Sequence, residues 1–384
     1  MRVLTLCALL VGCSSGSEDE RPPRGGEPGG EGGIVTSAFC EGIVTPPKDP
    51  PRFYEDNPTL PDANDSGAGL VYSDPAAQGM DGGVLEGAAS ELSGKPFVHS
   101  LVVMRHGAVV MERYFNGSAP GDSNAIHSSS KSMLAMLVGI AIEEGHIAGV
   151  DQPVSELAPD LFEGVGPEVA GITVGQLLTM SAGFEWREDV SEYQLQNEPN
   201  WIGAIVDLPL ETEPGAKFNY STCQSHLMGA VLAHATGSSL CDYAHDKLLR
   251  PIGAEAERWG RDPQGYFSGG YNVTMSPLEL LRFGQLVVDR GSFGGVQVVP
   301  ADWVDASVDE QIVDGGAYWY GYYFWLFRPP GEELDIAWGY GGQLVYTVPD
   351  HDVVVVITTN TSELDPDYDG GQLVLDHVIA AIVD

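Results

Sequence analysis

The order of strand-like and helix-like segments predicts an α+β domain whose antiparallel sheet is built from both ends of the chain, with a helical region inserted between them. Apolar and β-branched runs at about 98–104 and 108–115 come before the helical region, and runs at 344–348 and 353–359 follow it. The chain closes on an apolar helical segment at 371–383. We expect helices to flank the sheet and the active site to lie in the crevice between the two layers.

Four segments of the central region are predicted to be helices. They are 128–145, 173–180, 223–237 and 239–249. The first begins with serines, which are good N-cap residues, and ends at Gly145, a common C-terminal signal. A mostly helical lobe is therefore expected at about 128–262, within a domain that covers 61–384. A unit of about 300 residues is large enough to bury a substantial core.

The tetrapeptide Ser128-Ser129-Ser130-Lys131 lies where a loop ends and an apolar helix begins. Residues three apart share a helix face, with Cβ atoms roughly 5 to 6 Å apart, so Lys131 can reach the hydroxyl of Ser128. A serine becomes a nucleophile when a base takes its proton, and a lysine is such a base only when burial or a neighbour lowers its pKa. The N–H of Ser128 at a helix N-terminus would also favour an oxyanion. A solvated helix start has the same composition, so other segments must decide.

Two later segments supply that information. A Pro-Gly turn at 214–215 and a short extended piece lead to Tyr220-Ser221-Thr222, which places a tyrosine at the start of a helix. The segment Trp338-Gly-Tyr-Gly-Gly-Gln343 begins the first strand of a predicted hairpin. Glycines at that position would let a substrate backbone approach closely.

Taken in order, these segments resemble the serine β-lactamase and penicillin-binding-protein superfamily, in its class C-like branch of esterases, D-stereospecific peptidases and oligomer amidases. The family order is S-x-x-K, then Y-x-N, then a K/H-x-G strand. Here it corresponds to Ser128 with Lys131, to Tyr220-Ser221-Thr222 and to Tyr340-Gly341-Gly342. The W-G-Y-G-G-Q form is most similar to amidases of the 6-aminohexanoate-dimer hydrolase type and their esterase neighbours. The resemblance runs from about residue 84 to the C-terminus.

Two residues depart from the family pattern. Thr222 stands where the family usually has asparagine, and Tyr340 stands where β-lactamases have lysine and many esterase relatives have histidine. A neutral tyrosine cannot pair with the carboxylate of a β-lactam or a peptide C-terminus. We therefore rank β-lactamase and D-peptidase activity below hydrolysis of an ester or amide of a neutral or cationic small or peptide-like substrate.

The resemblance implies acyl transfer through an acyl-enzyme. Ser128 would attack the carbonyl carbon, Lys131 would accept the proton, and Tyr220 would pass it to the leaving group. A cationic lysine beside Tyr220 would favour the phenolate, so either residue could be the base. The oxyanion hole would be formed by the N–H groups of Ser128 and Gln343.

The resemblance also implies the substrate-binding residues. They are Tyr340, Gly341, Gly342, Thr222, Trp186 and Trp201. For Tyr340 and the two tryptophans, simple aromatic packing is the alternative. The two departures keep a second class of function open, a catalytically impaired relative that binds a cell-envelope ligand.

The N-terminus has the pattern of a bacterial lipoprotein signal. Met1-Arg2 is followed by an apolar stretch that ends in Leu10-Val11-Gly12-Cys13, so we expect a signal peptide at 1–12 and a lipid on Cys13. The Gly, Pro and Glu-rich stretch at 13–60 is expected to be a flexible tether. The chain would then lie in the cell envelope, on the outer membrane or the periplasmic face by analogy with such lipoproteins. A secreted protein with an ordinary signal is the alternative.

Composition sets the remaining limits. The formal net charge of −37 argues against nucleic acid as a partner. No metal-ligand spacing or nucleotide fingerprint occurs, so no metal or cofactor is expected, and the oligomeric state is not predicted. Cys223 and Cys241 lie near the starts of consecutive predicted helices, so either a disulfide between them or buried free thiols are expected.

Overall fold

The computed structural model describes residues 34–45, 67, 69–313, 316, 318–361 and 368–383. The predicted signal peptide at 1–12 and Cys13 lie outside these residues, as does most of the predicted tether. Among the helices of the described residues, none combines the length and the apolar character needed to cross a bilayer.

A nine-stranded sheet is the centre of the fold, in the order β10-β11-β12-β13-β14-β15-β3-β4-β2. Its strands are β2 (Val71–Tyr72), β3 (Val98–Arg105), β4 (Ala108–Tyr114), β10 (Ile312–Val313), β11 (Tyr318–Tyr320), β12 (Trp325–Phe327), β13 (Leu334–Gly339), β14 (Gln343–Val348) and β15 (Val353–Thr359). The C-terminal strand β15 pairs antiparallel with the N-terminal strand β3, with Val355 opposite Val103. The predicted fold class is confirmed, since both ends of the chain build one sheet flanked by helices.

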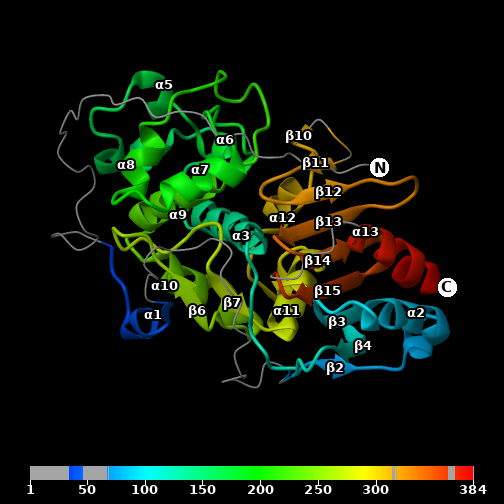
Figure 1. Ribbon diagram of the computed structural model, residues 1–384. Coiled ribbons are helices and arrows are strands. Elements are labelled where there is room, and N and C mark those ends of the chain that lie inside the picture. The colour runs from blue at the N-terminus through cyan, green and yellow to red at the C-terminus, as the bar shows by residue number, and fades with distance from the viewer. Residues whose placement is uncertain are drawn as a thin grey trace.

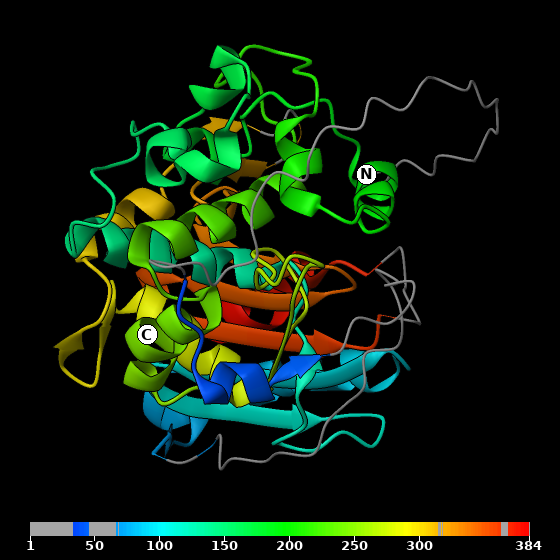
Figure 2. The same ribbon diagram turned by 90° about the vertical axis from the view of Figure 1, so that its left-hand side faces the viewer.

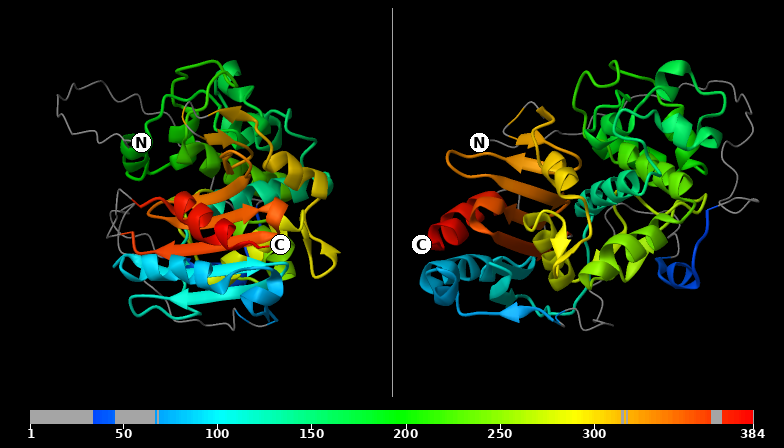
Figure 3. Two further views of the ribbon diagram at one scale, coloured as in Figure 1. Left: turned by 90° about the vertical axis from the view of Figure 1, so that its right-hand side faces the viewer. Right: turned by 180° about the vertical axis from the view of Figure 1, so that it is seen from behind.

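The two faces of this sheet are covered by different helices, as Figures 1 and 3 show. Successive side chains of a strand point to opposite faces. Val103 and Val355 accordingly pack in a core with α2 (Gly82–Ser93) and the C-terminal segment, whereas Val102 and Val354 pack in the core that contains α3 and α11. The C-terminal segment is α13 (Gly370–Leu373) followed by the short turns η6 (Val374–Val378) and η7 (Ile379–Ala381).

The helices of the central lobe, and the two that follow it, lie on the face of the sheet that carries Val102 and Val354. They are α3 (Ser129–Glu143), α4 (Val154–Leu157), η2 (Pro159–Phe162), α5 (Pro167–Ala170), α6 (Val174–Leu178), α7 (Glu188–Leu195), α8 (Trp201–Val206), α9 (Thr222–Thr236), α10 (Leu240–Ala244), η3 (His245–Leu249) and η4 (Arg250–Ile252), followed by α11 (Pro277–Val288) and α12 (Ala301–Ser307). Helix α3 is buried along nearly its whole length between this lobe and the sheet.

Two small sheets and two isolated turns complete the elements. Strands β1 (Val44–Thr45), β5 (Asn124–Ala125), β6 (Arg258–Gly260) and β7 (Val273–Met275) form a four-stranded sheet, and β8 (Ser292–Phe293) pairs with β9 (Val296–Gln297). The isolated turns are η1 (Pro75–Gln78) and η5 (Pro349–His351).

Residues 34–45, which we call the N-terminal strap, are folded although they fall within the predicted tether. The strap contains α1 (Ala38–Gly42), and β1 pairs in parallel with β6. Its Val35 N–H donates to the carbonyl of Gly237 at 3.0 Å. Figure 2 shows the strap, in blue, against the lower half of the helical lobe.

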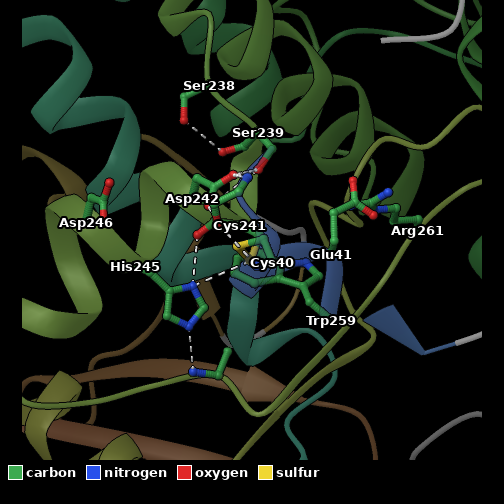
Figure 4. Close-up of a disulfide and its surroundings, with 12 residues drawn as sticks. Cys40, Glu41, Ser238, Ser239, Cys241, Asp242, His245, Asp246, Trp259 and Arg261 are labelled. Atoms are coloured by element: carbon green, nitrogen blue, oxygen red, sulfur yellow. Dashed lines mark hydrogen bonds and ion pairs between the residues drawn. A yellow bond between two sulfur atoms is a disulfide. The ribbon is translucent and has the colours of Figure 1, made fainter. Parts of the chain in front are cut away.

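The cysteines confirm one part of the sequence-based expectations, the buried free thiol at Cys223. A disulfide joins Cys40 of the strap to Cys241 of α10, and Cys223 is a buried free thiol. The predicted pair of Cys223 and Cys241 is therefore wrong, and so is a free thiol at Cys241. Proximity of two helix starts in sequence did not bring those thiols together, because Cys241 faces the strap (Figure 4).

Candidate active site

The N-terminal turn of α3 is fixed against the end of the sheet. Ser128 is the N-cap residue, and His127 before it has a φ of 47°. The hydroxyl of Ser129 donates to the carbonyl oxygens of Ala337 at 3.1 Å and Gln343 at 2.9 Å, which belong to β13 and β14. At Gly339 a Cβ atom would lie 2.2 Å from the carbonyl oxygen of residue 126, so only glycine permits this approach. The third predicted motif is thereby held beside the first.

Lys131 is almost fully buried and has three polar partners. Its Nζ lies 2.8 Å from Ser128 Oγ, 3.1 Å from Thr222 Oγ1 and 2.9 Å from the carbonyl oxygen of Gly270. A Cβ at Gly270 would lie 2.3 Å from Ser225 Oγ and 3.1 Å from Lys131 Nζ, so a larger residue at this position would displace both side chains. The three-residue spacing of Ser128 and Lys131 thus places them in contact, and Thr222 at the start of α9 is a further partner of the lysine.

Burial sets the electrostatics of this lysine. Burial lowers the pKa of Lys131 to about 8, while Glu188, Glu192 and Cys223 act in the opposite direction. Burial, with a smaller contribution from Lys131, lowers the pKa of the neighbouring His127 to about 4. Near neutral pH an appreciable fraction of Lys131 is therefore the free amine, whereas His127 is neutral.

Tyr220 lies beside the pair. Lys131 Nζ is 5.2 Å from the centroid of its ring, and its hydroxyl is within hydrogen-bonding reach of Ser128. The ring stacks on Trp325 with centroids 5.5 Å apart. Burial, and then the charge of Glu188, raise the pKa of Tyr220 well above its usual range. Burial and the charge of Glu188 thus oppose the phenolate that Lys131 was expected to favour.

Thr222 is held by a carboxylate that sequence reasoning missed. Its N–H donates to Glu188 Oε2 at 2.9 Å, and its hydroxyl donates to Glu188 Oε1. The indole N–H of Trp186 also donates to Glu188 Oε2, at 2.7 Å. Trp186 does not touch Lys131 in these bonds; it is linked to the lysine through Glu188 and Thr222. Trp201 instead packs on Tyr271, with ring centroids 6.5 Å apart, inside the helical lobe.

The strand of the third motif presents its glycines and Tyr340 near the first turn of α3. Tyr340 is 37% exposed, and its ring packs edge-on against His127 with centroids 5.9 Å apart. Gly341 and Gly342 have φ values of 79° and 95°, which favour glycine. Gln343 is buried, and its side-chain amide donates to Thr359 at 2.8 Å. An oxyanion hole formed by Ser128 and Gln343 stays a prediction.

A second acidic residue of α7 was also missed. Glu192 is buried, and Gln196 donates to its Oε1 at 3.3 Å. Burial and the charge of Glu188 raise the pKa of Glu192 to about 7. Residues 188–195 are polar enough to resemble a solvated helix, so nothing in the sequence distinguishes these two carboxylates from surface ones.

The described residues bring one group of potential metal ligands together, Cys40, Cys241 and His245. Both thiols of this group form the disulfide, so their sulfur atoms are not free to bind a metal as thiolates. The histidine is oriented by the protein itself, since its Nδ1 donates to the Cys241 carbonyl at 2.9 Å and its Nε2 accepts from the Ala256 N–H at 3.2 Å.

Comparison with known proteins finds relatives in both sequence and fold. The family model described as Beta-lactamase matches residues 76–378. The 6-aminohexanoate-dimer hydrolase of Paenarthrobacter ureafaciens is 27% identical over 284 residues, which cover 67% of this chain and 71% of the relative.

Solved structures share the fold at lower identity. A candidate 6-aminohexanoate-dimer hydrolase from Bacillus anthracis has a TM-score of 0.69 at 18% identity, covering 84% of this chain and 89% of its own. A family VIII carboxylesterase has a TM-score of 0.62 at 17% identity, covering 81% and 98%.

Proposed function

The chain belongs to the β-lactamase family, and the relatives similar to it include a hydrolase. From this premise we propose that it is a serine hydrolase that forms an acyl-enzyme on Ser128. The observation that carries the proposal is the 2.8 Å contact between Ser128 Oγ and Lys131 Nζ. The lysine is buried, and its pKa of about 8 gives it the basicity of a general base near neutral pH.

Each group has a role in this reaction. Lys131 takes the proton of Ser128 as Oγ attacks the carbonyl carbon, and the N–H groups of Ser128 and Gln343 receive the oxyanion. Tyr220 stays neutral and relays a proton from Lys131 to the leaving group, whose bond to the acyl carbon breaks. Water then attacks the acyl-enzyme, its proton passes to the lysine, and the acid leaves while Ser128 regains its proton.

The charges around the site favour a neutral or cationic ester or amide. The third motif presents Tyr340 in place of a cation, and the negative charge of Asp189 acts on that tyrosine. A substrate carboxylate would meet this charge as well as that of Glu188. An apolar part of the substrate can pack against the stacked rings of Tyr220 and Trp325. A β-lactam or a peptide C-terminus fits this site less well.

We also propose that the chain is an exported lipoprotein with its lipid on Cys13. The disulfide of Cys40 and Cys241 supports export, because such bonds persist mainly in oxidising compartments. Metabolic labelling with an alkyne fatty acid is expected to tag the wild type and not Cys13→Ala. Equal labelling of both would contradict the proposal.

A fluorophosphonate probe tests the acylating serine. We expect the probe to label the wild type, and peptide mass spectrometry to place the adduct on Ser128. Ser128→Ala should lose both labelling and hydrolysis of a short-chain p-nitrophenyl ester. Ser130→Ala is the matched control, since this hydroxyl donates only to the carbonyl of His127, at 2.9 Å. A folded wild type that reacts with neither reagent would contradict the proposal and favour a ligand-binding relative.

The pH profile tests the base. Because the free amine of Lys131 is the active form, kcat/KM should rise with pH and level off above the lysine pKa of about 8. The profile is measured with a p-nitrophenyl ester between pH 6 and pH 10. A profile that stays flat from pH 6 to pH 10, as it would if the titrating group were His127 with its pKa of about 4, would exclude Lys131 as that group.

A further inference from the structure

Lys131 can act as a base only if its lone pair faces Ser128. A neutral amine has two N–H donors and one lone pair. Its Nζ has three oxygen neighbours, on Ser128, Thr222 and Gly270. The carbonyl of Gly270 has no proton and always accepts. Whether the lone pair turns to Ser128 therefore depends on where the Thr222 hydroxyl sends its own proton.

Glu188 decides that direction. A carboxylate has no proton to give, so the Thr222 hydroxyl donates to Glu188 Oε1 and keeps its lone pairs for Lys131. The carboxylate is itself held by the N–H of Thr222 at 2.9 Å and by the indole of Trp186 at 2.7 Å. Both amine N–H groups are thereby assigned to Thr222 and Gly270, and the lone pair is left for Ser128.

We propose that Glu188 is a positioning residue for the reaction, which fixes the Thr222 hydroxyl as an acceptor and so aims the lone pair of Lys131 at Ser128. The role of Glu188 rests on the proposed function of Ser128 and Lys131. It also accounts for a departure of this chain from its family. An asparagine side-chain oxygen accepts from a lysine without help, whereas a threonine hydroxyl can either donate or accept and needs a partner that fixes its proton.

Other titratable groups also face Lys131. They are Glu188 and Glu192 of α7, Cys223 of α9, Tyr220 and His127. Among them Glu188 is the residue that bonds to Thr222, so its replacement changes both an orientation and a charge. The experiment must separate these two effects.

Glu188→Gln is the first variant. Its amide N–H can donate to Thr222 Oγ1, which frees the threonine proton to compete for the lysine lone pair. We expect kcat for a p-nitrophenyl ester to fall about tenfold or more, with little change in KM. Because Glu188 acts to raise the pKa of Lys131, the acidic limb of kcat/KM should also move to lower pH. Glu185→Gln removes the charge of an exposed residue three positions earlier and should change neither.

Thr222→Asn in the Glu188→Gln background separates orientation from charge. The asparagine oxygen accepts from Lys131 with no help from residue 188, so the double variant should regain most of the lost kcat although the carboxylate is still missing. A kcat that stays as low as in the single variant would overturn the positioning role, as would a Glu188→Gln enzyme as active as Glu185→Gln.

The titration of Lys131 gives a readout that does not depend on hydrolysis. The chain has five lysines, so NMR of protein labelled at lysine 13Cε can resolve Lys131, identified by its loss in Lys131→Met. The Lys131 signal should titrate at lower pH in Glu188→Gln than in the wild type. An unchanged titration overturns the proposal even if the enzyme is active. If the titration shifts but a fluorophosphonate does not label the protein, the link between Glu188 and Lys131 would be supported and the proposed hydrolase function would be rejected.

Discussion

Replacing Lys131 with methionine is expected to lower kcat/KM by about a thousandfold while the domain stays folded. General-base catalysis contributes about 10² to 10⁴ in rate, and no other described group that touches Ser128 Oγ is a base near neutral pH. Methionine fills similar volume and removes a charge whose burial is unfavourable, so the thermal midpoint should not fall greatly. Steady-state kinetics with a p-nitrophenyl ester and thermal unfolding by circular dichroism measure both.

Arginine at the same position distinguishes a base from a mere cation. Its guanidinium stays protonated, so Lys131→Arg should be as inactive as Lys131→Met. Lys247→Met is the matched control, because Lys247 pairs with Glu144 at the surface. A Lys131→Arg variant with near wild-type activity would show that Lys131 acts only through its charge, and Tyr220 would become the candidate base.

Much of the sheet could be predicted because its longer strands are marked by continuous apolar runs in the sequence. The runs that became β3, β4, β14 and β15 are apolar and rich in valine, and their bounds agree within one or two residues. Short strands such as β11 and β12 were missed, since three residues carry too little pattern. Helix α11 was also missed, although Ser276 and Glu279 form a capping box that marks its start.

The candidate site divides in the same way. Ser128 and Lys131 could be predicted because three residues of helix bring them together. Thr222 could be assigned to the same site because it occupies the third position of the second family motif. Glu188 could not be found, because its contacts with Thr222 depend on tertiary packing between α7 and α9. Cys40 was missed for a similar reason, since a glycine-rich neighbourhood gave no sign that the strap folds back on α10.

Removing the disulfide is expected to have the largest effect on stability. The bond between Cys40 and Cys241 closes a loop with a sequence separation of 201 residues. A loop of this length restricts the unfolded chain enough to stabilise the fold by about 3 to 5 kcal/mol. We therefore expect Cys40→Ser/Cys241→Ser to unfold at clearly lower urea concentration, with kcat at 25 °C nearly unchanged, because Ser128 and Lys131 belong to α3 and not to the strap.

The other contacts of the strap lie mostly at the surface, and we do not expect them to replace the bond. The Ser37 N–H donates to the Asp242 carboxylate at 2.8 Å, and the Phe39 ring packs edge-on against His245 with centroids 4.8 Å apart. Glu41 pairs with Arg261 at 3.1 Å, but its side chain is 56% exposed, and exposed ion pairs contribute about 0 to 1 kcal/mol. The two-residue pairing of β1 with β6 adds little more. Cys223→Ser, which removes the free thiol, is the matched control for loss of sulfur. Equal urea midpoints for the double variant and the wild type would mean that the strap holds to the domain without its disulfide.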